Sequence, residues 1–210
     1  MTEDKMIDAQ QPEKKAEPVS FSQMVYELLH DMIYIIAVVT LVFVFFMRMV
    51  SVEGPSMTPT LLDGDRLTLL SNTLYAQPKV GDVVVASVPT YSDGEAIVKR
   101  VIAVEGQEVD IRYDDYGVGT VYVDGQALEE PYINEDMQHP LYETIAFPTT
   151  VPEGCVFVMG DNRNHSADSR YTDIGIFDER YIMGKALMIV WPGQRDEYDP
   201  RDFGRLGVIH

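Results

Sequence analysis

Residues 32–47 read Met-Ile-Tyr-Ile-Ile-Ala-Val-Val-Thr-Leu-Val-Phe-Val-Phe-Phe-Met and contain no charged side chain. This run of 16 residues is slightly shorter than the ~20 residues that cross a bilayer as a helix. Apolar neighbours on both sides lengthen it, because charged side chains at the ends of a span can reach the interface. The sequence therefore predicts a single transmembrane helix over residues 28–50.

A cleaved signal peptide and a buried helix are the two alternatives to a retained span. A cleaved signal peptide would carry a basic flank before the apolar run and a small-x-small site after it. Here Glu27, His30 and Asp31 precede the run, and no Ala-x-Ala follows it. A buried helix of a soluble domain stays open, although such a helix usually carries a polar stripe. A retained span is the preferred interpretation.

The N-terminal tail is polar and charged over residues 1–20, without an apolar period. Such composition is typical of disorder. Its lysines slightly outweigh the arginines that follow the span, so the positive-inside rule favours a cytoplasmic N-terminus. The expected organisation is a disordered cytoplasmic tail over 1–27, the transmembrane helix over 28–50 and an extracytoplasmic domain over 51–210.

Charge and cysteine content exclude several classes of function. The formal net charge is −18, which argues against nucleic acid as a partner, because phosphates need a basic surface. It argues equally against electrostatic docking on anionic lipid, so contact with membrane lipid has to come from apolar residues. The single cysteine, Cys155, excludes an intramolecular disulfide and is interpreted as a small core residue.

After residue 51 the pattern changes to short runs rich in Val, Ile, Tyr and Thr, separated by Gly or Pro, which predicts a mainly β domain. Asp124-Gly125 indicates a hairpin, because this pair accepts the positive φ of a type I′ turn. The segment 132–150 is polar and aromatic and is interpreted as a loop insertion. The predicted strands are Arg66–Leu70, Asp82–Val88, Ala96–Val104, Glu108–Tyr113, Thr120–Val123, Val156–Met159 and Tyr181–Val190.

A serine stands in a turn shaped by glycine and proline directly after the apolar run, in Gly54-Pro55-Ser56-Met57-Thr58-Pro59-Thr60. A serine hydroxyl is a poor nucleophile unless a neighbouring base takes its proton. Among the four histidines, only His165 lies in a plausible site, so a Ser-His-Asp triad stays open. The residues contain no motif for a metal or a phosphate, and no cofactor is expected.

Lysine is the other possible base, and Lys99 lies inside the apolar run Ile97-Val98-Lys99-Arg100-Val101. Burial disfavours the charged form of lysine and can lower its pKa by several units. Strand alternation places Lys99 on the face opposite to Arg100. The alternative is an ordinary edge-strand lysine that points to water, and the residues alone favour neither.

A dense polar loop follows an apolar strand at Gly160-Asp161-Asn162-Arg163-Asn164-His165-Ser166-Ala167-Asp168-Ser169-Arg170. Gly160 permits a turn, and the short polar side chains form local bonds to the backbone. The loop is either a structured turn only or a part of a site. In the second case Ser166 would hold the lysine amine, and Asp168 and Arg170 would form an ion pair that stiffens the loop.

Taken together, these motifs resemble those of bacterial type I signal peptidases, the membrane-bound Ser-Lys proteases that remove signal peptides from exported proteins. The resemblance covers the span and most of residues 51–190, and the single span and compact middle resemble the Gram-positive form. It rests on four motifs in the family's order: Ser56-Met57-Thr58-Pro59-Thr60, Gly81-Asp82-Val83-Val84, Lys99-Arg100-Val101, and the loop from Gly160 to Arg170.

The resemblance implies that Ser56 is the nucleophile and Lys99 the general base. It implies that Ser166 bonds the Lys99 amine and that Asp168 pairs with Arg170. Gly160 and Asp161 would support the site, and the Ser56 backbone N–H would stabilise the oxyanion. Some family members add a serine hydroxyl two residues before the nucleophile; here that position is Gly54, which has no side chain.

The resemblance also implies the fold and the substrate. The fold would be the all-β catalytic domain shared with self-cleaving LexA-like repressors, tethered to the cell membrane by one helix. The substrate, a preprotein signal peptide with small residues at −1 and −3, would lie as an added strand. We expect a monomer without metal or cofactor. The substrate contacts would come from Gly54, Pro55, Met57, Ile97 and Val98.

Three rival interpretations were considered. A self-cleaving repressor-type protease would need a DNA-binding domain and a scissile Ala-Gly or Cys-Gly segment, and the sequence offers neither. A catalytically silent, membrane-tethered β-domain that binds extended peptides is the main alternative. A structural anchor for other membrane proteins has no positive feature in the sequence.

Overall fold

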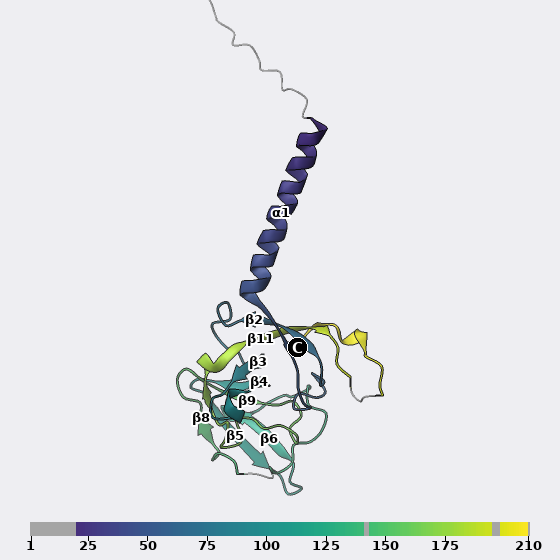
Figure 1. Ribbon diagram of the computed structural model, residues 1–210. Helices are drawn as coiled ribbons and strands as arrows, with labels where there is room; N and C mark the ends of the chain where they lie inside the picture. The colour runs from purple at the N-terminus through teal and green to yellow at the C-terminus, as the bar shows by residue number, and fades with distance from the viewer. Residues whose placement is uncertain (1–19, 141–142, 195–197, 210) are drawn as a thin grey trace, which may run out of the picture. The chain divides into compact units, whose positions relative to one another are not determined.

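The computed structural model describes residues 20–140, 143–194 and 198–209 (Figure 1). The chain divides into two compact units between Leu41 and Val42. The predicted disordered tail lies outside the described residues up to residue 19.

The N-terminal helix α1 spans Phe21–Phe46. Its first turn is capped by the side chain of Gln23, which accepts a hydrogen bond from the Ser20 N–H at 3.1 Å, one half of a capping box. The helix contains a stretch, Phe21–Val42, that is long and apolar enough to cross a membrane. Residues 21–27 are therefore helical, and their assignment to the disordered tail was wrong.

The helix also ends earlier than predicted, because residues 47–50 belong to a strand. Strand β1, Met47–Ser51, pairs antiparallel with β2, Arg66–Ser71. An apolar sequence suits a span and a strand equally well, so composition alone does not separate the two. The backbone bonds to β2 end the helix at Phe46.

The larger sheet is antiparallel and contains eight strands. Its order is β1-β2-β11-β3-β4-β9-β10, and β12 pairs with β11. All of the longer predicted strands of this sheet are present. The remaining strands are β3 Val83–Ser87, β4 Ala96–Val104, β9 Cys155–Met159, β10 Phe177–Asp178, β11 Ile182–Trp191 and β12 Gly207–Val208.

The smaller sheet has the order β7-β6-β5-β8. Its strands are β5 Glu108–Tyr113, β6 Gly119–Val123, β7 Gln126–Ala127 and β8 Thr149–Thr150. The predicted hairpin joins β6 to β7, with φ of 51° at Asp124 and 76° at Gly125, the positive angles that a type I′ turn requires. The described residues also contain short 3-10 helices: η1 Ser92–Gly94, η2 Glu179–Tyr181 and η3 Phe203–Arg205.

The predicted loop over residues 132–150 is mostly irregular in its described part, but it is tied to the fold at several points. Met137 is buried and forms an isolated bridge with Gly119. Thr144 forms another bridge with Tyr171. The last two residues are β8, which pairs with β5. The segment therefore closes the smaller sheet as well as connecting it to β9.

Three apolar clusters fill the described part of the β unit, and β4 contributes buried residues to two of them, before and after a register shift between Val101 and Ala103. Ile97 and Val101 pack in one cluster, while Ile102 and Ala103 pack in the cluster beneath the smaller sheet. The third cluster contains Met57, the residue after Ser56, and Leu61, a few residues further on. The turn that carries Ser56 is thereby fixed to the core by the residues just after it.

Candidate active site

A groove lies between two strand edges that lack a neighbour within the described fold. Strand β1 is an end strand and pairs only with β2. Strand β4 pairs with β3 over residues 96–100, but its pairing with β9 begins only at Arg100, which leaves one edge of residues 96–99 open. Residues of both edges line a groove of about 430 Å³, and Ser56 and Lys99 are part of its wall.

The turn before Ser56 is shaped by local backbone chemistry. Gly54 adopts a φ of +80°, which favours glycine, and its N–H donates to Asp63 Oδ1 at 2.8 Å. The Thr58 N–H donates to the Pro55 carbonyl at 3.0 Å. Because Met57 is fully buried on one side of this turn, the neighbouring Ser56 side chain is free to face the groove.

The Lys99 amine lies 2.8 Å from Ser56 Oγ. It also donates to the carbonyl oxygen of Val98 at 2.9 Å, and the residue is only 4% exposed. Burial lowers the pKa of Lys99 to about 8, although the Asp168 and Asp161 carboxylates oppose this shift. The structure therefore places a serine hydroxyl beside an amine whose neutral form is more populated near neutral pH than that of an ordinary lysine.

The alternative base, His165, lines the same groove. Within the described residues, however, it makes no hydrogen bond to the Ser56 hydroxyl, which is bonded to Lys99. The loop is arranged so that the His165 N–H donates to the carbonyl of Asn162. The geometry thus favours the lysine over a Ser-His-Asp triad.

The polar loop from Gly160 to Arg170 packs against the Ser56 turn. The Asn162 N–H donates to the Ser56 carbonyl at 3.0 Å, and its side-chain amide donates to the Pro55 carbonyl at 3.1 Å. Gly160 lies so close that a Cβ atom there would overlap the Ser56 carbonyl oxygen. Only glycine allows this approach, which gives Gly160 a definite steric role.

Asp168 and Arg170 form the ion pair that the sequence suggested, with Nε–Oδ1 and Nη2–Oδ2 distances of 2.8 and 2.9 Å. Asp168 also accepts the Gly160 N–H at 2.9 Å. Burial by itself would raise the pKa of Asp168, but the Arg170 charge outweighs burial and holds that pKa below its usual value. The pair thus ties the two ends of the loop together.

Ser166 is buried next to this pair. The resemblance implied a hydrogen bond from Ser166 to the lysine amine, and the structure does not contain it. The Ser166 hydroxyl forms no hydrogen bond with the part of the chain that the structure describes, although it lies close enough to Asp168 to help lower the pKa of that carboxyl. The amine instead donates to Ser56 and to the Val98 carbonyl, which accounts for the missing contact.

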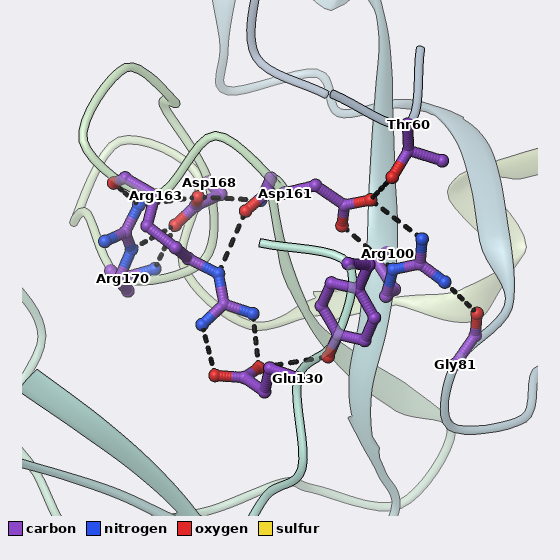
Figure 2. A network of polar contacts seen from close by, with 10 residues as sticks. Thr60, Gly81, Arg100, Glu130, Asp161, Arg163, Asp168 and Arg170 are labelled. Atoms are coloured by element: carbon purple, nitrogen blue, oxygen red, sulfur yellow. Dashed lines mark hydrogen bonds and ion pairs between the residues drawn. The ribbon is translucent and has the colours of Figure 1, made fainter. Parts of the chain in front are cut away.

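A buried polar layer, which the sequence did not indicate as a unit, lies behind the Gly160 loop (Figure 2). Asp161 accepts two hydrogen bonds from Arg100, at 2.8 and 2.7 Å, and one from the Thr60 hydroxyl. Arg100 follows Lys99, and Thr60 lies four residues after Ser56. One carboxylate therefore connects the strand of the lysine, the turn of the serine and the polar loop.

Of the predicted substrate contacts, Gly54, Pro55, Ile97 and Val98 line the groove. Met57 does not, because its side chain packs wholly in the core. Further residues that complete the lining are Val50, Ser51, Val52, Glu53, Val85, Tyr91, Glu95, Ala96 and Ala167.

Comparison with known proteins defines the class to which this fold and site belong. A family described as signal peptidase, peptidase S26, matches residues 25–191. That range includes most of the apolar helix, both strand edges and the complete polar loop. The chain belongs to the signal peptidase family.

Two relatives with similar sequences agree with this assignment. The chain is 39% identical over 163 residues to a probable signal peptidase I-1 of Synechocystis, with 74% of each chain covered. It is 32% identical over 177 residues to signal peptidase I of Bacillus licheniformis, covering 80% of this chain and 89% of that one. A crystal structure of a signal peptidase I from Enterococcus faecalis aligns with 52% of this chain and 96% of its own, at 30% identity and a TM-score of 0.39.

Proposed function

We propose that this protein is a type I signal peptidase, a serine endopeptidase that cleaves signal peptides from exported preproteins with a Ser56–Lys99 dyad. The observation that carries the proposal is the 2.8 Å contact between the Lys99 amine and the Ser56 hydroxyl. The low pKa of the buried Lys99, about 8, makes that amine a competent base near neutral pH.

The proposed reaction has two stages. Neutral Lys99 accepts the Ser56 proton while Oγ attacks the scissile carbonyl carbon, and the new oxyanion lies at the Ser56 backbone N–H. The tetrahedral intermediate collapses to an acyl-enzyme when protonated Lys99 gives its proton to the leaving amine. Water, deprotonated by Lys99, then attacks the ester carbon; the bond to Ser56 Oγ breaks as Lys99 returns the proton to that oxygen, and the signal peptide is released as a free acid. Gly54 contributes no second side-chain donor in this scheme.

The substrate would bind as an extended strand in the groove. The open edge of β1 and the open edge of β4 at residues 96–99 offer backbone donors and acceptors on both sides, and such strand addition is a common mode of peptide recognition. Alternate side chains of an added strand would point to the same wall. The apolar lining residues Ile97 and Val98 suit small side chains at −1 and −3.

Helix α1 would anchor the protein in the cell membrane. Its large apolar side chains from Phe21 to Val42 are exposed on the protein. Exposure of so much apolar surface is unfavourable in water and favourable in lipid. We propose a single-pass topology with a cytoplasmic N-terminus and an extracytoplasmic β unit. Signal peptides reach that side of the membrane, so tethering raises the effective concentration of the two partners.

The direct test is cleavage of a preprotein with an Ala-x-Ala site by detergent-solubilised protein, with Ser56→Ala as the matched variant. Mass spectrometry of the new N-terminus should give a cut directly after the second Ala in the wild type and none in the variant. A folded wild-type protein that binds the preprotein without cutting it would instead support a silent peptide-binding domain.

A further inference from the structure

Two residues of the smaller-sheet segment reach the polar layer behind the site. Glu130 and Tyr132 follow β7 and flank Pro131, which fixes its own φ and thereby stiffens the link. The segment is held to β6 by the bond from the Leu128 N–H to the Val121 carbonyl at 2.9 Å. Neither Glu130 nor Tyr132 lines the substrate groove.

Glu130 holds the guanidinium of Arg163 with both carboxylate oxygens (Figure 2). The two side chains are 9% and 1% exposed, so this is a buried, bidentate pair of the kind that fixes geometry as well as charge. The same guanidinium donates from Nε to the Gly160 carbonyl at 3.0 Å. Glu130 therefore acts on the Gly160 peptide group through one intervening side chain.

Tyr132 acts on the other side of the same loop. Its hydroxyl donates to Glu130 Oε1 at 3.0 Å, and burial raises the pKa of Tyr132, so the donor proton is retained. Its ring centre lies 4.0 Å from Cζ of Arg100, within the range of a cation–π contact. Arg100 in turn holds Asp161, the residue after Gly160.

We propose that Glu130 and Tyr132 form a clasp that positions the Gly160–Ser166 loop against Ser56, and that they are positioning residues for the cleavage reaction. The inference rests on the proposed function. The clasp holds the carbonyl of Gly160 through Arg163 and the side chain of Asp161 through Arg100. Ser56 touches this loop at its own carbonyl, through the Asn162 N–H, so a displaced loop moves the nucleophile relative to Lys99.

The test compares Glu130→Gln with Glu129→Gln, which changes the exposed neighbouring carboxylate. Each variant is assayed for kcat, KM and the pH midpoint of kcat/KM at a temperature where it is folded. For Glu130→Gln we expect kcat to fall about tenfold with KM within about twofold, because alignment is lost while the groove is retained. The midpoint should move upward, since a looser loop admits water to Lys99. Glu129→Gln should match the wild type.

Tyr132→Phe and Tyr132→Leu provide a second comparison that leaves every buried charge paired, in case Glu130→Gln does not fold. The phenylalanine variant keeps the ring on Arg100 and should retain more of kcat than the leucine variant. If kcat and the midpoint stay at wild-type values while only the melting temperature falls, the residues are merely structural and the proposal is overturned.

A further experiment tests the clasp without relying on cleavage activity. Lysines are labelled chemically over a range of pH, and mass spectrometry gives the pH at which labelling of Lys99 is half-maximal. The chain has six lysines, and Lys99 is resolved from the others by peptide. A higher labelling midpoint for Lys99 in Glu130→Gln supports the clasp even if the wild type cleaves no preprotein. An unchanged labelling midpoint contradicts it whether or not the wild type is active.

Discussion

Gly160 and Ser166 are packed so closely that a Cβ atom at position 160 would overlap the Ser166 hydroxyl oxygen. The same atom would overlap the carbonyl oxygen of Ser56. The backbone of the polar loop therefore lies so close to the Ser56 turn that only glycine fits at position 160. This contact makes the position of Ser56 depend on the absence of a side chain in a different segment.

Gly160→Ala should lower kcat/KM by about 100-fold, since a displacement on the order of 1 Å at a reacting group has that effect. The measurement is steady-state cleavage of an Ala-x-Ala substrate. Gly154→Ala is the control: its φ is +68°, so alanine is strained there, but nothing lies within 4 Å. The control should lose stability and keep its activity. Equal losses of kcat/KM in both variants would contradict the steric argument.

The pH dependence of kcat/KM should follow Lys99. With a pKa of about 8, only about a tenth of the amine is neutral at pH 7. The rate should therefore rise with pH and level off above about 8, well below the ordinary lysine value of 10.5. Assays between about pH 6 and about pH 10 test this, because kcat/KM reports the free enzyme. A plateau that extends down to about pH 6.5 would indicate histidine as the base instead.

Lys99→Met should abolish cleavage and increase stability at low pH. The pKa of Lys99 is lower in the folded chain than in the unfolded one, so the unfolded chain binds more protons between about pH 8 and 10.5. Below about pH 8 the folded wild type contains a buried charged amine, which destabilises it. The free energy of unfolding of Lys99→Met should therefore exceed that of the wild type by about 1–3 kcal/mol. Above about pH 10.5 the gain should vanish. The measurement is denaturant unfolding of the variant and the wild type at one pH below about 8 and one above about 10.5. A variant that is less stable than the wild type at both would contradict the predicted cost of burying Lys99.

Arg205, near the C-terminus, should be important for stability. It donates to both oxygens of Asp65, at 2.9 and 2.8 Å, and Asp65 is 0% exposed. Arg205→Met leaves that carboxylate buried without its counter-charge, which should cost about 3 kcal/mol. Arg180→Met, which breaks a surface pair with Asp178, should leave the melting temperature nearly unchanged. Thermal unfolding of the two variants side by side gives the comparison.

The sequence predicted the long strands and missed the short ones for a physical reason. Strands such as β4 and β11 contain enough alternating or continuous apolar residues to be recognised locally. The two-residue strands β8, β10 and β12 have no period of their own, because their pairing is set by tertiary neighbours; β7 is the exception, since the Asp124-Gly125 hairpin predicted it. The boundary at Met47 was missed because the same apolar residues suit a helix and a strand.

The site was predictable where its signals are local. Ser56 stands in a turn and Lys99 in an apolar strand, and each pattern is visible within a few residues. Glu130 contacts Arg163 across 33 residues, and Thr60 contacts Asp161 across 101. No local pattern encodes such pairs. The expected bond from Ser166 to Lys99 was inferred from resemblance, and the amine has other acceptors in this structure.

The open edges of β1 and β4 mean that the larger sheet is one strand short at the groove. A polypeptide can fill this gap only if its own backbone N–H and C=O groups are unoccupied. A helical segment has already bonded those groups to itself, and a segment inside a folded domain has bonded them to its neighbours. The groove therefore distinguishes chains by conformation before it distinguishes them by sequence. If the proposed function is correct, a cleavage site that is helical or already folded is protected, and it becomes a substrate only when its backbone is extended.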